Sequence, residues 1–450
     1  MTQQTSADEL RISRILHAGY LFESGGTRIA FDPIFENPFS RNCYAFPEVR
    51  FDHEAIRKLE IDAVFISHFH DDHCSFDSLD LLDRGTPIFL FCVFPRLAEL
   101  VRALGFENVH SLEIDAPVSI GSFEIVPKRA LDAEIDSILH VKAAGFDVLN
   151  VVDSWIDDVT LTDLASVEWD MILWPFQTMR ELEVLSPAHA APATGEIPHE
   201  WIEQLQVLYP RYVVPSSCQL VHEPWSWYNR ALFPITYAGF QQQVEAAIPG
   251  SRVVRLNPSV SVALRKNEYG ETFLTKVEPL PWIEPIGPQD VDYDYEPDLV
   301  APPTFEITKH FPALTDDQAK LAFDFCKSGL LTRYRELGTP DDEFFEGTRR
   351  WRLTVFDHHG AKTDFDFEVK GDTIEPLDVD EARSYEWSTE IPLFKLHSAL
   401  TTGESLTSMY LRISRSDFDV LEDPLVRCLF DGEFAGYQAA QLKRLQNRGK

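Results

Sequence analysis

A run of metal-binding side chains follows directly after a short apolar segment, and no other feature constrains the fold of this chain as much. Residues 61–67, IDAVFIS, are almost entirely apolar, which is typical of a strand buried on both faces of a layered α/β protein. Next comes HFHDDH, at residues 68–73. Imidazoles and carboxylates this close together form a compact donor set for a divalent metal. The sequence therefore predicts a metal-binding loop after a buried strand, in preference to an ordinary solvated polar loop.

The segments on either side of this loop predict an α/β architecture. Residues 14–35 contain two apolar runs around Ser24-Gly25-Gly26, the pattern of a β-hairpin with a tight glycine turn. Between residues 75 and 106 the pattern predicts a helix (75–84), a strand (86–94) and a second helix. Several strands joined by short turns are expected from residue 118 to residue 152, as in a mixed or antiparallel second sheet. Two sheets with helices outside them are the predicted arrangement.

The loop and its context resemble the metallo-β-lactamase superfamily. The HxHxDH motif of that family is present as HFHDDH, and HAGYLFESGGTRIAFDPIF precedes it. The resemblance covers about residues 10–265 and implies an α/β fold, an αββα sandwich with one or two divalent metal ions at its edge, zinc or else iron or manganese. It also implies that His68 and His70 hold one metal, and that Asp72 and His73 hold the other.

Two further carboxylates are candidate ligands. The family has a bridging Asp after a later apolar strand, and Asp153 follows FDVLNVV here; it could instead cap a helix or a turn, but its order and context favour a ligand. The family usually supplies another His before the bridging Asp, and this sequence has Asp132, Glu134 and Asp136 in that stretch. Asp136 is preferred over His140, because His140 lies within an expected strand, where a packed or exposed His is more common.

The last His of the family's pattern is missing as well. It usually stands in a P-x-H context, but here Pro215 is followed by Ser216-Ser217-Cys218. His222 lies a few residues further on and is as consistent with a ligand as with a loop residue that binds nothing. Cys74 and Cys218 could be soft ligands, although an isolated Cys is more often a small core residue.

Three stretches are similar to the metallo-β-lactamase-type half of the CMP-N-acetylneuraminate hydroxylase family. They are residues 136–155, residues 174–177 (WPFQ) and residues 213–234. That family carries an iron–sulfur Rieske domain, and this sequence has no CxH…CxxH pair. An oxygenase role would therefore need a separate reductase.

Three functional hypotheses follow. In the first, the protein is a metal-dependent hydrolase that uses metal-activated water on an ester, amide or phosphodiester, with Asp72 and Asp153 as catalytic proton acceptors. In the second, Asp136 replaces the usual His, the hard oxygen donors favour iron or manganese, and the protein is a non-haem iron oxygenase. In the third, the metal site is non-catalytic. The first two require a small-molecule substrate.

A proline-rich acidic segment predicts a domain boundary. Residues 276–304 contain seven prolines and the run DVDYDYEPD, so a linker is expected between a metal-binding domain at 1–275 and a smaller α+β domain at 305–450. The second domain is expected to contain helices at 316–337, 392–404 and 423–446 and strands at 349–356 and 408–414. Residues 386–430 loosely resemble a sterol-carrier-type domain, but a small packing or dimerisation domain is preferred, so a homodimer is a possible partner.

Composition excludes several classes of partner. The sequence has 40 Lys and Arg residues against 73 Asp and Glu residues, a formal net charge of −33, which repels nucleic acids and anionic membranes. It has no run of 18 apolar residues, so no membrane insertion is expected. The six cysteines form no CxxC pair, and the first residues do not read as a signal peptide. These features favour a cytoplasmic protein.

Overall fold

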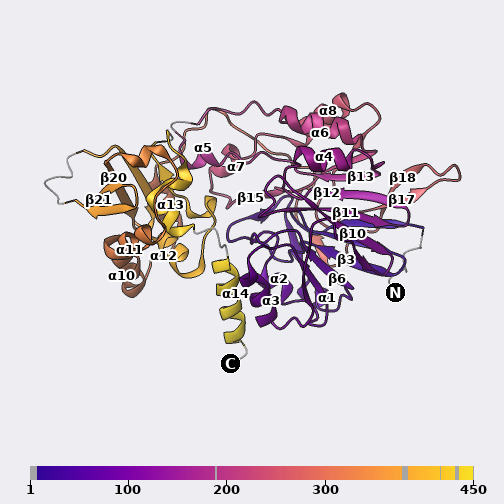
Figure 1. Ribbon diagram of the computed structural model, residues 1–450, viewed down its shortest axis with the longest axis horizontal. Coiled ribbons are helices and arrows are strands. Elements are labelled where there is room, and N and C mark those ends of the chain that lie inside the picture. Colours follow the sequence, from indigo (N-terminus) through magenta and orange to yellow (C-terminus); the bar gives the residue numbers. More distant parts are fainter. Residues whose placement is uncertain (1–7, 188–189, 378–383, 416, 431–434, 449–450) are drawn as a thin grey trace.

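Two large sheets form the N-terminal part of the molecule (Figure 1). The structure is a computed structural model and describes residues 8–187, 190–377, 384–415, 417–430 and 435–448. Within this part of the chain, the first sheet has eight strands, in the order β18 (Thr272–Val277), β17 (Ser261–Lys266), β1 (Leu10–Arg14), β2 (Tyr20–Ser24), β3 (Thr27–Phe31), β6 (Ala63–Ile66), β7 (Ile88–Leu90) and β8 (Val109–Ser111). The hairpin of β2 and β3 confirms the predicted glycine turn, since Ser24 pairs with Thr27.

The second sheet has seven strands among the described residues. Their order is β16 (Arg252–Val253), β14 (Tyr212–Pro215), β13 (Met171–Trp174), β12 (Phe146–Asn150), β11 (Ser137–Ala143), β10 (Phe123–Arg129) and β9 (Val118–Ile120). The strands from β9 to β12 are antiparallel, whereas β12, β13, β14 and β16 are parallel, so the sheet is mixed as predicted. Apolar side chains of both sheets, among them Phe22, Phe65, Val141 and Leu173, pack into one buried cluster between them.

Helices cover the outer faces of both sheets (Figure 1). The helices α1 (His53–Ile56), α2 (Phe76–Leu79) and α3 (Pro95–Ala103) lie on the side of the first sheet, and α4 (Asp158–Leu164), α6 (His199–Leu208) and α8 (Tyr237–Ala247) lie on the side of the second. Their buried faces carry apolar residues such as Val101, Trp201 and Phe240. This arrangement confirms the predicted sandwich of two sheets with helices outside them.

The helix predicted at 75–84 is much shorter than expected. It is present only as α2, which ends at Leu79. Beyond it the chain turns, and the Arg84 side chain donates a hydrogen bond to the Leu79 carbonyl over 3.1 Å. A carbonyl at the end of a helix has no partner within the helix, and here the Leu82 N–H of the following turn (3.0 Å) and Arg84 both donate to it without another helical turn. The strand predicted at 86–94 is likewise only the three residues of β7.

The C-terminal part contains a separate five-stranded sheet with helices on one side. Its described strands are β22 (Thr373–Pro376), β21 (Lys362–Lys370), β20 (Arg349–Phe356), β23 (Trp387–Pro392) and β24 (Arg412–Ile413). The helix predicted at 316–337 forms as α10 (Asp316–Asp324), a π-helical turn (Phe325–Gly329) and α11 (Leu330–Glu336). The helix predicted at 392–404 corresponds to α12 (Leu393–Thr402). These elements confirm an additional domain that is rich in sheet.

Two expectations for this domain are wrong. The strand predicted at 408–414 is only β24, because Tyr410 adopts a left-handed backbone (φ 52°) that interrupts an extended chain. The helix predicted at 423–446 is two helices, α13 (Pro424–Leu429) and α14 (Ala435–Arg448), and Phe430 leaves the helical conformation between them (φ −113°, ψ 79°). Residues 431–434 of that prediction lie outside the described residues.

The predicted linker packs on the N-terminal domain. Within it β19 (Ile283–Pro285) pairs with β5 (Val49–Phe51), and the Tyr293 hydroxyl donates to the Leu220 carbonyl over 3.0 Å. Regular structure is therefore present where the prolines predict none, because an edge strand tolerates proline. The domain boundary near residue 304 stays a prediction. Across the described residues, none of the helices combines the length and the apolar character that crossing a membrane requires.

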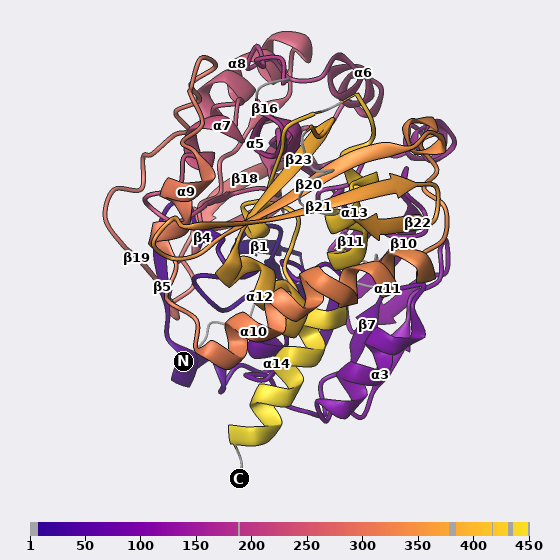
Figure 2. The same ribbon diagram turned by 90° about the vertical axis from the view of Figure 1, so that its left-hand side faces the viewer.

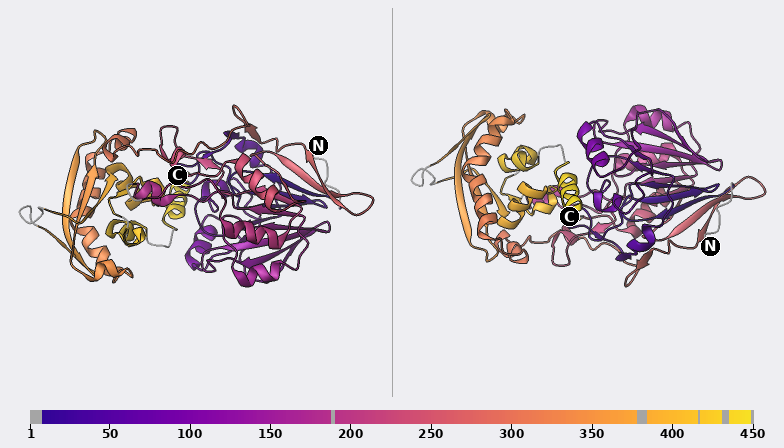
Figure 3. Two further views of the ribbon diagram at one scale, coloured as in Figure 1. Left: turned by 90° about the horizontal axis from the view of Figure 1, so that it is seen from above. Right: turned by 90° about the horizontal axis from the view of Figure 1, so that it is seen from below.

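The two parts of the molecule touch through segments distant in sequence. Figure 3 shows α5 (Glu181–Leu185), which belongs to the N-terminal half of the chain, reaching into the C-terminal part, where it contacts β24. In the other direction, α14 reaches the N-terminal domain and packs on α2 and α3 (Figure 2).

Candidate metal centre

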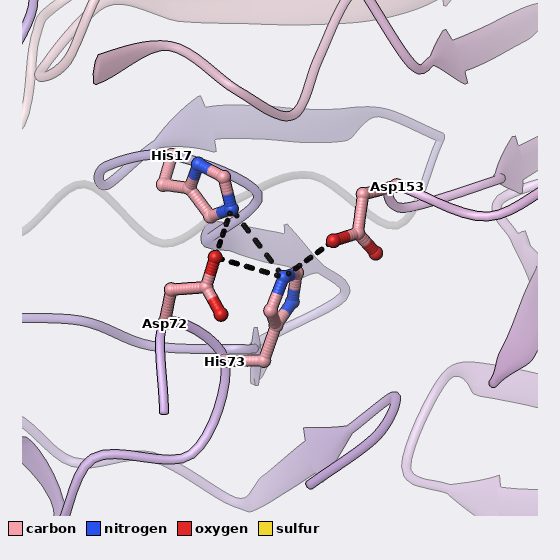
Figure 4. Close-up of side chains that lie close together, drawn as sticks. All are labelled: His17, Asp72, His73 and Asp153. Atoms are coloured by element: carbon pink, nitrogen blue, oxygen red, sulfur yellow. Dashed lines mark hydrogen bonds and ion pairs between the residues drawn. The ribbon is translucent and has the colours of Figure 1, made fainter. Parts of the chain in front are cut away.

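Loops that follow three strands bring four potential metal ligands together. His17 follows β1, Asp72 and His73 lie in the loop after β6, and Asp153 follows β12. One donor atom of each residue lies within 4.8 Å of the others (Figure 4). His17 and His73 are almost fully buried, whereas about a quarter of each carboxylate side chain is exposed (24%). The cluster therefore has a buried imidazole side and a carboxylate side that solvent can reach.

The distances within this cluster fit a single metal ion. His17 Nε2 lies 3.3 Å from His73 Nε2 and 3.2 Å from Asp72 Oδ2. His73 Nε2 lies 3.1 Å from Asp153 Oδ2. Ligand atoms about 2.0–2.1 Å from a tetrahedral metal lie roughly 3.3–3.4 Å from one another. Donors at this spacing, from two imidazoles and two carboxylates, are a set that divalent metals bind.

A second pair of imidazoles lies on the other side of Asp153. His68 Nε2 is 3.0 Å from His70 Nδ1 and 3.8 Å from Asp153 Oδ1. The two oxygens of Asp153 therefore face different imidazoles, Oδ2 toward His73 and Oδ1 toward His68. Asp153 Oδ1 is buried and has no hydrogen-bond partner in the described part of the chain. A buried carboxylate oxygen without a donor is costly unless a cation occupies the site, so the residues fit a metal here as well.

Asp136 lies beside this second pair. Its Oδ2 accepts a hydrogen bond from the Ser154 hydroxyl over 2.8 Å. Its Oδ1 is 3.9 Å from His68 Nδ1, is buried, and has no hydrogen-bond partner among the residues described. Burial and the negative charge of Asp153 raise the pKa of Asp136 to about 6. Asp136 is thus near the cluster, but outside the four-donor group.

A buried carboxylate orients the ring of His73. Asp32 is fully buried, and its Oδ2 lies 2.9 Å from His73 Nδ1. Asp32 also accepts hydrogen bonds from the backbone N–H of Ser67 (2.7 Å) and from its hydroxyl (2.6 Å), and that hydroxyl lies 3.0 Å from His68 Nδ1. The Nδ1 atoms of both rings are therefore occupied, and their Nε2 atoms face the cluster, as in metal sites whose histidines are held by outer carboxylates.

Burial and neighbouring charges shift the pKa values of the cluster in different directions, because the carboxylates of Asp153 and Asp72 outweigh burial at His73 and raise the pKa of its ring well above the usual value. Burial, with the charge of His73, holds the pKa of His68 well below its usual value, so its ring is neutral. Burial opposes ionisation of Asp153, but the charge of His73 and its hydrogen bond to the carboxylate outweigh burial and lower the pKa of this carboxyl. The pKa of Asp72 is lowered in the same way, against burial, by His73 and His17. Neutral imidazole and ionised carboxylate are the forms that bind metal.

His17 is not among the ligands predicted from the sequence. The residue lies in the turn between β1 and β2 with a left-handed backbone (φ 52°). Arg14, fully buried, donates to the carbonyls of His17, Pro215 (2.8 Å) and Ser216 (2.7 Å). Arg14 thus ties the turn that carries His17 to the segment where the family's last His is missing. The one sequence feature that includes His17 is HAGY at the start of the hairpin, and it lies far along the chain from the HFHDDH motif.

The remaining residues that the sequence offers as candidate ligands lie outside the four-donor group. His140 Nε2 is 2.7 Å from Asp147 Oδ1, and its ring packs on Trp169, away from the four-donor group. His222 is buried against aromatic rings, and burial, with the charge of Lys395, lowers its pKa to about 3. Cys74 is a fully buried core residue. Asp132, Glu134 and Cys218 are also not part of the four-donor group.

Two comparisons of sequence match part of this chain. Residues 11–145 match the family model described as the β-lactamase superfamily domain. The cytidine monophosphate-N-acetylneuraminic acid hydroxylase of Danio rerio is 29% identical over 160 residues. That match covers 34% of this chain and 27% of the hydroxylase, so it spans only about a quarter of the relative.

Solved structures show more distant likeness. Igni18, a metallo hydrolase from the archaeon Ignicoccus hospitalis, is 18% identical with a TM-score of 0.40, covering 60% of this chain and 100% of Igni18. CmlA, a diiron β-hydroxylase from Streptomyces venezuelae, is 19% identical with a TM-score of 0.39, covering 57% of this chain and 54% of CmlA.

None of these similarities supports the sterol-carrier-type domain expected in the C-terminal part. Residues 11–145 thus match a β-lactamase superfamily domain, and the two facing sheets around the HFHDDH loop have the α/β arrangement expected of that fold.

Proposed function

We propose that this protein is a metal-dependent hydrolase with two adjacent metal sites. His68 and His70, with Asp136 nearby, would hold one metal, and His17, Asp72 and His73 would hold the other. Asp153 would bridge them. The observation that supports this assignment best is the direction of the two Asp153 oxygens, each toward an imidazole of a different site. The match of residues 11–145 to the superfamily domain supports a metal-dependent enzyme but does not specify its reaction.

The chemistry would depend on water at the metal site. A bound divalent metal acts as a Lewis acid and makes water a competent nucleophile near neutral pH. Asp72 and Asp153 have lowered pKa values and are ionised at neutral pH, so each carboxylate can take up a proton during the reaction. Asp32 keeps the His73 ring in one orientation. The substrate would be a small molecule with an ester, amide or phosphodiester bond.

Hydrolysis can be tested on the whole chain. The protein, loaded separately with zinc and with manganese, would be assayed against chromogenic esters, amides and phosphodiesters. Asp153→Asn should abolish any activity found, because it removes the carboxylate charge that both sites share. Asp158→Asn, an exposed residue in the first turn of α4, is the matched control and should retain activity. Hydrolysis that survives Asp153→Asn would contradict the assignment.

An iron-dependent oxygenase is the second candidate. Asp136 adds a hard oxygen donor beside His68, and oxygen donors favour iron or manganese over zinc. The Danio rerio relative is named as a hydroxylase, which also favours an oxygenase. A separate reductase would then have to deliver electrons. Iron in the purified protein, with oxygen consumption when a chemical reductant is supplied, would favour this candidate; zinc without oxygen consumption would favour the hydrolase.

A further inference from the structure

We propose that the C-terminal helix α14 is a positioning element of the metal centre. It would hold the loop of residues 68–74 in the conformation that presents His70, Asp72 and His73 to metal. Like the proposed function, this role requires that the loop binds metal. It does not depend on which reaction follows. Four contacts between distant parts of the chain support it.

The first contact comes from Gln438, a fully buried residue of α14. Its Nε2 donates hydrogen bonds to the carbonyls of Phe69 (3.0 Å) and Cys74 (3.2 Å). These two carbonyls lie on either side of the turn in which the backbone N–H groups of His73 and Cys74 donate to the His70 carbonyl. A single side-chain amide therefore joins the two ends of the ligand-bearing turn.

Gln441 makes the second contact, one helical turn further along the same face of α14. Its Oε1 accepts a hydrogen bond from the Phe76 N–H (2.9 Å), and its Nε2 donates to the Ser75 hydroxyl (3.1 Å). Ser75 is the N-cap residue of α2, but its own side chain makes no capping hydrogen bond. The first N–H groups of a helix need an external partner, and Gln441 supplies one from the other domain. The end of the motif loop is thereby fixed.

Arg41 supplies the third and fourth contacts, to Gly403 and to Tyr437, from the opposite side of the loop. Its guanidinium forms an ion pair with Asp71 in the motif, and both side chains are largely buried (11% and 13% exposed). Arg41 Nε also donates to the Gly403 carbonyl over 2.8 Å, and the guanidinium lies 4.1 Å from the ring centroid of Tyr437 on α14. The loop is thus linked to the C-terminal domain through a buried charge and an aromatic ring.

These contacts have a physical consequence for metal binding. Burying an amide side chain costs free energy unless the amide is hydrogen-bonded. If α14 served only to cover α2 and α3, an apolar side chain in place of Gln438 would pack there without that cost. A loop that is ordered before the metal arrives binds it more tightly, because less ordering is needed on binding. Loss of an outer contact to metal ligands typically weakens affinity about 10- to 100-fold.

The test compares metal affinity in full-length variants. Gln438→Met removes both donors with little change in volume, and it should weaken zinc binding about 10- to 100-fold in competition against a chromogenic chelator. It should also reduce the rise in Tm that saturating zinc produces and alter the absorption spectrum of the cobalt-loaded protein. Gln446→Met, on the exposed face of α14, is the matched control and should behave as the wild type.

Wild-type metal affinity in folded Gln438→Met would overturn this role while leaving the metal centre intact. A variant that lowers Tm equally with and without zinc would also overturn it, since that result indicates only a packing role. If Gln438→Met does not fold, Arg41→Gln takes its place with the same expected weakening and the same contrary outcome. Failure of the wild type to bind any metal would overturn both this role and the proposed function.

Discussion

The turn between β1 and β2 places an imidazole beside candidate ligands that follow β6 and β12. His17 Nε2 lies within 3.3 Å of donor atoms of both His73 and Asp72. The segment after β14, where the family's last His is missing, is connected to this turn through Arg14. The turn that carries His17 is therefore held beside the segment in which a family His was expected.

Replacing His17 should affect one metal more than the other. We expect His17→Ala to bind one metal with at least about tenfold lower affinity, because one of the four donors of that site is lost, and to retain the metal beside His68 and His70. Elemental analysis after dialysis against a weak chelator would show the loss. The control is His199→Ala, whose side chain is 84% exposed. Equal loss of both metals, or no loss, would contradict the role of His17.

The buried carboxyl group of Glu36 should make the folding stability depend on pH. Glu36 is not one of the candidate metal ligands. Its pKa is raised to about 7, chiefly because it is buried, although the Ser75 hydroxyl donates to it over 2.6 Å. The unfolded chain releases this proton at lower pH, so folding stability falls as the pH rises from about 4.5 to about 7. Glu36→Gln should remove this fall and raise the unfolding free energy at pH 8 by on the order of 1–3 kcal/mol.

Urea unfolding at pH 5 and pH 8 would measure this effect. The exposed Glu203→Gln is the matched control and should keep the pH dependence of the wild type. A Glu36→Gln protein whose stability changes with pH as much as that of the wild type would disprove the prediction.

At the scale of elements, the site depends on a close approach between two backbone segments. The turn that carries His17 is closed by hydrogen bonds from Ile15 N–H to the Gly19 carbonyl (2.8 Å) and from Gly19 N–H to the Leu16 carbonyl (2.7 Å). A Cβ at Gly19 would lie 2.6 Å from the Asp32 carbonyl oxygen. Only glycine therefore lets the His17 turn lie against the segment that carries Asp32.

Gly19→Ala should separate these segments. We expect a loss of about 1–3 kcal/mol in unfolding free energy, because backbone atoms must move to admit the methyl group. Metal binding should weaken as well, since His17 and Asp32 both move. Thermal unfolding and a zinc titration would measure the two effects. Gly347→Ala is the control, because a Cβ there meets only side-chain atoms, at 3.7 Å. Unchanged stability and metal affinity in Gly19→Ala would show that the close contact between the His17 turn and the Asp32 segment is not important.

The elements that could be predicted from sequence are those with strong local patterns. The run IDAVFIS and the glycine turn are local signals, and β6 and the β2–β3 hairpin form as expected. The length of α2 was not predictable, because its last carbonyls are satisfied by the turn that follows it, and the Leu79 carbonyl also by the Arg84 side chain. His68, His70, Asp72 and His73 could be proposed as a group because they are adjacent in sequence. His17 could not, because its place depends on how β1 pairs with β2 and on Arg14.

At the scale of the whole molecule, the N-terminal and C-terminal parts of the chain meet at the motif loop. Gln438 and Gln441 of α14 contact the loop from one side, and the Arg41–Asp71 pair leads to Gly403 from the other. The sequence predicts a boundary near residue 304 from its prolines, but no local pattern indicates that the last helix returns to the loop. Contacts between segments so far apart become visible only in the folded chain.

The metal content of the protein tests the central claim most directly. Protein purified without added metal or chelator would be analysed for zinc, iron and manganese per chain, together with the His68→Ala/His70→Ala double variant. We predict two metal ions per wild-type chain and the loss of at least one in the double variant, which should remain folded because neither imidazole belongs to an apolar core cluster. No metal in the wild type even after reconstitution, or unchanged stoichiometry in the double variant, would contradict a metal centre at the HFHDDH loop.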